Sequence, residues 1–469
     1  MRASLFIPGF MDLPFESRTE ARLAPGQSVT FDLSPVFTQA VLNLQEDMAV
    51  QAKVTLTWSA GGTEQETSRS GPATIYKNTA LTWDDTRKIS SYITPNEATV
   101  SGFAARTLSG AGTSAGSLRF SRTMMQAIRI CDSLGAYGIT YVQNLDAPFS
   151  KALGKAEIID TVHFPRITLY NRTGDCSDTT ALLCSLLESV GIRTAALTTP
   201  GHIFAAFDTD EPAENAPYLR GGGLEVLTKN GKVWIPVETT ILSQGFMAAW
   251  ASASELVRKY SSAGPFEFIP VSEMRDSFPA LPLPKESLTV AEPAASRVDA
   301  AYSTSLTGLT DALYTARLKS LDTTLATLSG RPAVKVRVQQ GILHALFGKL
   351  KEAETAFRKA ITEDPTLVSP YVNLANVRLL SNDDDGALVA VKQGLARNAD
   401  SALLNLLAAR IYSNKGDAAN TAVYFAKVQK SAPDMAARFA GLAPAAGGSR
   451  PQRAAEAGQA PVVIWGTDQ

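Results

Sequence analysis

The sequence predicts a multidomain protein with an N-terminal β-sandwich, a central α+β domain and a C-terminal all-α repeat domain. Three observations support this: alternating apolar and polar residues near the N-terminus, mixed helical and strand patterns in the middle, and a helical period near the end. A chain of 469 residues is also too long for one hydrophobic core. The predicted segments are 1–108 (β-sandwich), 118–292 (α+β domain), 300–437 (repeats) and 438–469 (disordered tail).

Alternating residues identify the strands of the predicted β-sandwich. Strand patterns extend over residues 20–107 and are clearest at 28–33 and 50–58. Gly61-Gly62 and Gly71-Pro72 are typical of turns between such strands. Short strands separated by regular turns favour a sandwich of roughly 100 residues.

The central domain is predicted from one helix followed by several strands. The helical pattern begins at Cys176 and ends near Gly191. Two strand patterns follow at 192–198 and 203–207. Asn230-Gly231 then indicates a hairpin, because both turn residues tolerate positive φ.

The C-terminal region repeats with a period of 34 residues. Asp364-Pro365, Asn398-Ala399 and Ala432-Pro433 share this spacing (399 − 365 and 433 − 399). Gly348 and Gly416 fall two periods apart, where each helix pair is expected to turn. The pattern resembles the tetratricopeptide repeat, a helix–turn–helix unit that stacks into a protein-binding solenoid. A capping helix or helix pair is expected before it, at residues 301–330.

Composition excludes several classes of protein. Hydrophobic residues make up 45%, charged residues 19%, and the net charge is −1, so no nucleic-acid partner is expected. No apolar run approaches the ~18 residues of a membrane span. The apolar patch within residues 1–10 is short and interrupted by Pro8-Gly9, so we expect no signal peptide and a cytoplasmic location, or export if the N-terminus is truncated.

Cysteine and histidine are sparse. The odd cysteine count argues against a disulfide framework, and the scattered histidines argue against a metal site, so no metal or cofactor is predicted. The residues are Cys131, Cys176, Cys184, His163, His202 and His344.

Cys176 is the candidate nucleophile, because it begins the predicted helix. Exposed N–H groups and the helix dipole favour a thiolate at this position and lower a cysteine pKa. The alternative is a small buried hydrophobic residue, which is our interpretation of Cys131 and Cys184. Asp175 and Asp178 are predicted to cap the helix.

His202 is the candidate general base, and it follows Pro200-Gly201 at the start of a predicted strand. Two acids are candidates for orienting it. Asp208 lies six residues along the same strand, about 20 Å away and beyond reach. Glu238 ends a separate strand that can pair with the His202 strand, and is preferred. His163 and His344 are interpreted as structural.

Together these segments resemble bacterial transglutaminase-like domains over roughly residues 120–260. The resemblance rests on residues 164–169, 174–178, 187–192, 200–204 and 234–239. It implies a papain-like α+β fold in which Cys176 is the nucleophile, His202 the general base, and Glu238 holds the position usually occupied by aspartate. It further implies acyl transfer from glutamine carboxamides to amines, or amide hydrolysis, and some members of the family have lost activity.

The sequence therefore predicts a cysteine-dependent enzyme that forms a thioester with protein or peptide substrates. Transfer to an amine and hydrolysis, as in a peptidase whose repeats recruit its substrate, both remain open. The alternative is a catalytically dormant scaffold that binds protein partners through its repeats and its β-sandwich.

Overall fold

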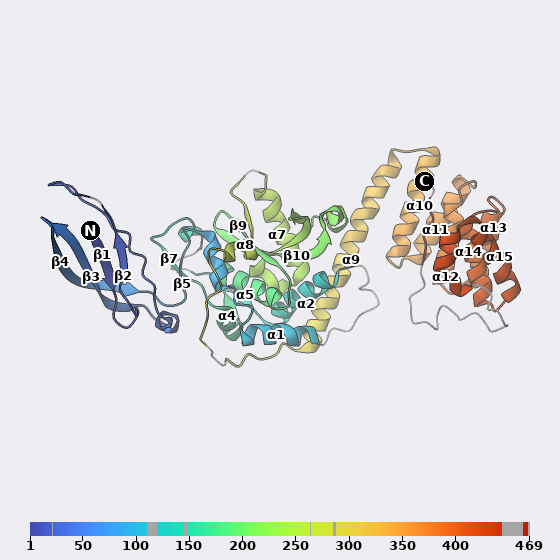
Figure 1. Cartoon of the computed structure of the whole chain (residues 1–469). Helices are drawn as coiled ribbons and strands as arrows, with labels where there is room; N and C mark the ends of the chain where they lie inside the picture. The colour runs from blue at the N-terminus through green and yellow to red at the C-terminus, as the bar shows by residue number, and fades with distance from the viewer. Residues whose placement is uncertain are drawn as a thin grey trace. The chain divides into compact units, whose positions relative to one another are not determined.

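The chain divides into two compact units, Met1–Leu309 and Thr310–Gln469 (Figure 1). The boundary falls inside the long helix α9 (Ala295–Ala326). The structure, a computed structural model, describes residues 1–20, 22–109, 120–144, 149–262, 264–284, 288–442 and 463–467. The finer domain boundaries expected from the sequence stay predictions.

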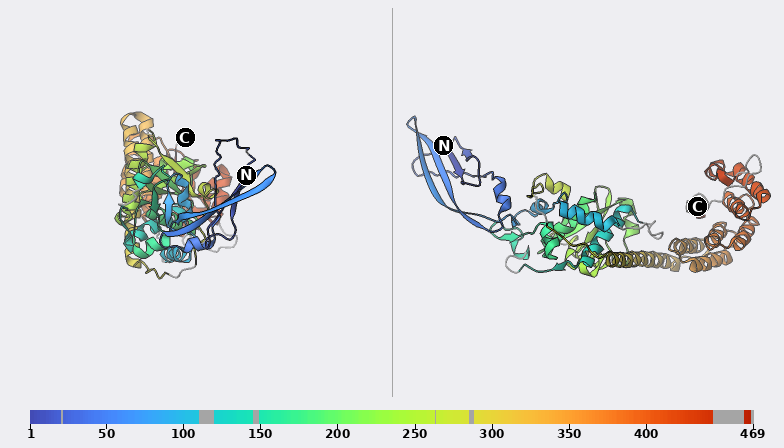
Figure 2. Two further views of the ribbon diagram at one scale, coloured as in Figure 1. Left: turned by 90° about the vertical axis from the view of Figure 1, so that its left-hand side faces the viewer. Right: turned by 90° about the horizontal axis from the view of Figure 1, so that it is seen from below.

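A four-stranded antiparallel sheet begins the first unit, with the strand order β2-β1-β3-β4. Its strands are β1 (Arg2–Phe6), β2 (Phe15–Arg18), β3 (Met48–Ala60) and β4 (Thr63–Ile75). Strands β3 and β4 form a long hairpin (Figure 2), and its turn residues Gly61 and Gly62 have φ of 61° and 85°. The prediction of a β-rich N-terminal region is confirmed, as is the turn at Gly61-Gly62.

Several details of this region differ from the prediction. Residues 28–33 form no strand, and Gly71-Pro72 lies inside β4 instead of in a turn. Strand β4 is at the edge of the sheet, where a proline costs no ladder hydrogen bond. Among residues 1–20 and 22–109, these four strands form the one sheet of more than two strands, so that part shows no second layer of a sandwich.

A helical segment replaces the strands expected towards residue 107. The 3-10 helix η2 (Thr86–Tyr92) is followed by helix α1 (Ala98–Ser109). Helix α1 buries Val100, Phe103 and Thr107, which are spaced three and four residues apart. This period is helical, so the earlier strand interpretation of this segment was wrong.

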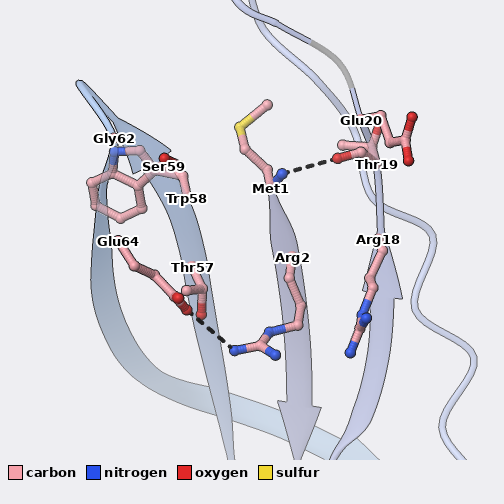
Figure 3. A pocket seen from close by; sticks show the side chains of 10 residues that line it. All are labelled: Met1, Arg2, Arg18, Thr19, Glu20, Thr57, Trp58, Ser59, Gly62 and Glu64. Carbon is pink, nitrogen blue, oxygen red and sulfur yellow. Dashed lines mark hydrogen bonds and ion pairs between the residues drawn. The ribbon is translucent and has the colours of Figure 1, made fainter.

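A cavity of about 630 Å³ opens beside the N-terminal sheet (Figure 3). The Met1 amine donates a 2.9 Å hydrogen bond to the Thr19 carbonyl at its rim, and Arg2 lies 3.6 Å from Glu64. Ten residues line it: Met1, Arg2, Arg18, Thr19, Glu20, Thr57, Trp58, Ser59, Gly62 and Glu64. None of these ten is a cysteine or histidine, so the cavity is distinct from the predicted catalytic residues.

The central part of the first unit contains a five-stranded antiparallel sheet, ordered β11-β12-β10-β9-β13. Its strands are β9 (Thr194–Thr199), β10 (His202–Pro212), β11 (Leu227–Lys229), β12 (Lys232–Val237) and β13 (Glu267–Pro270). Asn230 and Gly231 turn the β11–β12 hairpin with φ of 53° and 72°, as predicted. The order places β10, which begins with His202, directly beside β12.

Helices pack against this central sheet. Helix α5 packs against β10 and β9, and helix α7 packs against β12. Leu197, Phe204 and Trp234 form an apolar cluster with Ala253 and Val257 of α7. The other elements include β5 (Ala80–Thr82), α2 (Arg122–Tyr137), β6 (Thr140–Tyr141), β7 (Ile159–Thr161), α4 (Pro165–Asn171), β8 (Thr173–Gly174), α5 (Cys176–Ser189), α7 (Phe246–Tyr260) and α8 (Val271–Arg275).

The second unit is a stack of helix pairs, which confirms the predicted helical C-terminal region. The helices are α10 (Gly330–Leu346), α11 (Leu350–Glu363), α12 (Ser369–Leu380), α13 (Asp384–Leu395), α14 (Ala402–Asn414), α15 (Ala418–Ser431) and α16 (Pro433–Arg438). Gly348 and Gly416 turn the first and third pairs with φ of 73° and 74°. A Cβ at Gly341 would lie 2.4 Å from the Phe357 ring, so glycine there allows the close approach of α10 and α11.

Part of the predicted disordered tail is in contact with this stack. Residues 463–467 lie against the helices, where Trp465 packs on their apolar core. Residues 443–462 and 468–469 lie outside the described residues, so the prediction is not tested for them.

Candidate active site

Helix α5 begins at Cys176 with a reciprocal cap. The Asp175 carboxylate accepts hydrogen bonds from the backbone N–H groups of Ser177 (2.8 Å) and Asp178 (3.0 Å). In return, the Asp178 carboxylate accepts from the Asp175 N–H at 3.1 Å. These two aspartates therefore cap the helix, as expected from the sequence. Among the described residues, no group accepts a hydrogen bond from the N–H of Cys176.

His202 and Glu238 meet at one end of the central sheet. His202 is the first residue of β10, and Glu238 directly follows β12 as the N-cap of the 3-10 helix η5 (Thr239–Gln244). The pairing of Ala205 with Val237 places the start of β10 beside the end of β12. His202 Nε2 lies 2.6 Å from Glu238 Oε2, which is a short hydrogen bond.

The Glu238 carboxylate is buried and well satisfied. Its Oε1 atom accepts hydrogen bonds from the Thr240 N–H at 3.0 Å and the Thr240 hydroxyl at 2.7 Å. Burial by itself raises the pKa of Glu238, but the hydrogen bond and charge of His202 and the bonds from Thr240 outweigh it, so the pKa is lowered. The group is thus held as a carboxylate, which makes His202 Nε2 the hydrogen-bond donor.

The first turn of α5 contacts the residues that follow His202 and Glu238. The hydroxyls of Thr179 and Thr180 lie 3.0 Å and 3.1 Å from the Thr239 hydroxyl. The Thr180 hydroxyl also donates to the Ile203 carbonyl at 3.4 Å. Residues three and four positions apart share a helix face, so Cys176 lies above these threonines on the side of the histidine–glutamate pair.

The three predicted residues are therefore brought together to different degrees. His202 and Glu238 contact each other directly, whereas the described hydrogen bonds include none between Cys176 Sγ and the His202 ring. The carboxylate of Glu238 and the backbone N–H of Ile203 both act on the Cys176 thiol. The catalytic roles of all three residues stay predictions.

Cys176 is buried, with 7% of the residue exposed, and its environment favours the protonated thiol. Burial raises the pKa of Cys176 well above its ordinary value, and the neighbouring Asp175 carboxylate raises it further. The Ile203 N–H lowers this pKa by a smaller amount. Burial and the nearby carboxylates therefore act against the lowering of the pKa that was expected at the helix N-terminus.

Tyr141 is a residue of this site that the sequence did not reveal. Strand β6 pairs in parallel with β8, which places Tyr141 opposite Gly174. Burial raises the pKa of Tyr141, and the charges of Cys176, Asp175 and Glu238 raise it further. Its hydroxyl group therefore lies within the electrostatic reach of all three. No local pattern indicates this, because it depends on a two-residue pairing between distant segments.

The other candidates have structural partners. His163 Nδ1 lies 2.9 Å from Asp178, and the hydrogen bond to this aspartate raises the pKa of His163. His344 Nδ1 lies 2.9 Å from the Tyr314 hydroxyl. Asp208 forms an ion pair with Arg193 and not with His202. Cys131 and Cys184 are fully buried, and burial raises the pKa of both thiols.

The described side chains form no cluster of three or more histidine, cysteine or acidic groups that could hold a metal ion. Within the same described residues, every helix is too short or too polar to span a membrane.

Comparisons with known proteins add little to this geometry. No family model matches the chain, and no curated protein matches it. Among solved structures, the crystal structure of MamA matches with 18% sequence identity and a TM-score of 0.23, covering 30% of this chain and 84% of MamA. A similarity at this level does not define the family of the chain.

Proposed function

We propose that the chain is a cysteine-dependent acyltransferase or amide hydrolase that uses Cys176, His202 and Glu238 on protein or peptide substrates. The hydrogen bond between His202 and Glu238, beside the N-terminus of α5, is the observation that carries the proposal. The order of these elements, and the resemblance of their sequence to transglutaminase-like domains, support the same chemistry.

The first step is proton transfer from the thiol. Glu238 holds the proton of His202 on Nε2, which leaves Nδ1 as the basic ring nitrogen. Nδ1 takes the proton from Cys176 Sγ, and the resulting thiolate attacks the carboxamide or peptide carbonyl carbon. Because the resting thiol is protonated, this transfer has to accompany substrate binding and the approach of the two side chains.

The second step needs donors for the oxyanion. The Cys176 N–H points from the helix N-terminus and is not used within the helix cap. The Tyr141 hydroxyl is our candidate for the second donor, since its pKa responds to the Cys176 charge. Loss of one oxyanion donor costs about 3 kcal/mol in characterised enzymes.

The third step releases the first product and resolves the thioester. The imidazolium of His202 gives its proton to the leaving nitrogen as the carbon–nitrogen bond breaks. An amine or water then attacks the thioester carbonyl, His202 accepts a proton from it, and the carbon–sulfur bond breaks to restore the cysteine. An amine acceptor makes the chain a transferase, and water makes it a hydrolase.

A dormant scaffold is the second candidate function. The buried thiol of Cys176 and its raised pKa favour this alternative, since buried cysteines with such a pKa are usually inert. In this case the helical stack, read as tetratricopeptide repeats from its 34-residue period, binds a protein partner.

One experiment separates these functions. A generic protein rich in glutamine and lysine is incubated with the full chain and with Cys176→Ala, and the products are analysed by mass spectrometry. New chain termini indicate hydrolysis, and isopeptide-linked species indicate transfer. Neither product, or equal amounts from both proteins, supports the scaffold.

A further inference from the structure

Helix α12 presents two asparagine side chains to the backbone of the C-terminal segment 463–467. Asn373 Nδ2 donates to the Gly466 carbonyl at 3.0 Å, and its Oδ1 accepts from the Gly466 N–H at 2.7 Å. Asn376 Nδ2 donates to the Ile464 carbonyl at 2.9 Å. Three hydrogen bonds thus involve only backbone atoms of the segment.

We propose that α12 carries a binding site for an extended peptide, and that residues 463–467 of the same chain occupy it as a built-in competitor. Asn373 and Asn376 are three residues apart, so their Cβ atoms are about 5–6 Å apart on one helix face. Ile464 and Gly466 are two residues apart, which spans about 6.6 Å in an extended chain. The two spacings are similar, so this helix face can pair with the backbone of an extended peptide.

The burial of both asparagines supports a dedicated site. Asn373 and Asn376 are 0% and 1% exposed as whole residues, which is uncommon for asparagine unless its hydrogen bonds are satisfied. The backbone groups of Gly466 satisfy both ends of the Asn373 amide. Without a peptide in this position, the two buried amides would lack these hydrogen-bond partners, which would destabilise the folded protein.

The shape of the site selects the residues of the segment. A Cβ at Gly466 would lie 3.2 Å from Val372 and 3.3 Å from Ser369, so the site has little space for a side chain there. Trp465 packs against the apolar core of the stack, and Ile464 packs against the cluster that includes Phe425. The ligand class is therefore an uncharged extended peptide with an apolar residue, an aromatic residue and glycine in succession.

A tethered occupant competes strongly with a free peptide. Two segments joined within one chain reach effective concentrations on the order of millimolar when the connection spans the distance between their sites. A partner peptide at micromolar concentration would thus bind the intact chain weakly until the segment is released.

The test uses the full chain and a fluorescent peptide with the sequence of residues 459–469. Gly466→Val in the protein places a side chain against Val372 and leaves the helical stack unchanged. We expect the peptide to bind Gly466→Val at least about tenfold more tightly than the wild type, measured by fluorescence anisotropy. A peptide with valine in place of its glycine is the matched ligand control and should not bind.

The asparagines are tested in the Gly466→Val background. Asn376→Leu should abolish peptide binding, whereas Asn414→Leu, an exposed asparagine on α14, should leave it unchanged. Circular dichroism checks that each variant is folded. If an asparagine variant does not fold, the comparison of the wild type with Gly466→Val still tests the proposal. Equal peptide binding by the wild type and Gly466→Val would overturn the proposal. So would a dimer in light scattering that Gly466→Val dissociates, because the segment would then belong to a second copy.

Discussion

His202 Nε2 and Glu238 Oε2 lie 2.6 Å apart, although 36 residues separate them in the sequence. The contact forms because β10 and β12 are antiparallel neighbours, so the start of one strand meets the end of the other. It assigns the proton to Nε2 and leaves Nδ1 for the thiol. The whole proposed reaction depends on this orientation of the ring.

Replacing Glu238 should therefore slow acylation. In Glu238→Gln a neutral amide replaces the carboxylate and can stabilise the wrong ring tautomer. We expect the rate of thioester formation to fall about 10²–10⁴-fold. Stopped-flow detection of the leaving group measures this rate. Asp208→Asn is the matched control, since Asp208 is a buried acid on the His202 strand β10 that is paired with Arg193, and it should change the rate little. Comparable losses in both variants would contradict the role of Glu238.

The same carboxylate should make stability depend on pH in acid. Its pKa is lowered in the folded protein, so its contribution is present above the unfolded pKa near 4.3 and is lost as the pH falls through the folded value. The stability advantage of the wild type over Glu238→Gln should thus shrink between pH 6 and pH 3. Urea unfolding at both pH values measures this stability advantage. An advantage that grows as the pH falls would contradict a lowered pKa of Glu238 in the folded protein.

Asp132 should have the opposite effect. Burial raises its pKa to about 6, against hydrogen bonds from the Phe246 N–H and the Ser305 hydroxyl that lower it. The folded state therefore holds a proton that the unfolded state releases, and stability falls as the pH rises from about 4 to 6. The loss is about 3 kcal/mol at 1.36 kcal/mol per pKa unit. Asp132→Asn should lack this slope in urea unfolding, and an unchanged slope would exclude Asp132 as its source.

Gly201, which directly precedes His202, should be required for full stability. Gly201 has φ of +73°, and a Cβ there would lie 2.7 Å from the Ser150 Cβ. Gly231 has φ of +72° with nothing within 4 Å, so Gly231→Ala carries the same backbone strain without the contact. We expect Gly201→Ala to be less stable than Gly231→Ala by roughly 1–3 kcal/mol in urea unfolding. Equal losses would mean that Ser150 moves aside freely.

Much of the site follows from local sequence signals. Asp175 and Asp178 show the spacing of a capping pair, and Asn230-Gly231 shows a hairpin turn, so the starts of α5 and of β12 could both be predicted. Glu238 was preferred over Asp208 on strand geometry alone, and the structure pairs Asp208 with Arg193. Local periodicity also predicted the helix pairs that turn at Gly348 and Gly416.

Features that depend on tertiary contacts were not predictable. The pKa of Cys176 is set by burial under neighbouring elements, which a helix-terminus argument does not include. Tyr141 reaches the site through a two-residue parallel pairing, and segment 463–467 is held by side chains on α12 that lie 88 and 93 residues earlier. Pro72 looked like a turn residue because the sequence does not show that β4 is an edge strand.

The most direct test of the account is the site of covalent acylation. The full chain is mixed with a p-nitrophenyl ester of N-acetylglycine, quenched in acid, and analysed by intact mass and peptide mapping. The account predicts one acyl group on Cys176, sensitive to hydroxylamine, retained in Cys184→Ala and greatly reduced in His202→Ala. Acylation spread over other residues, or a Cys176 that stays unmodified while the ester is consumed equally by Cys176→Ala, would contradict it.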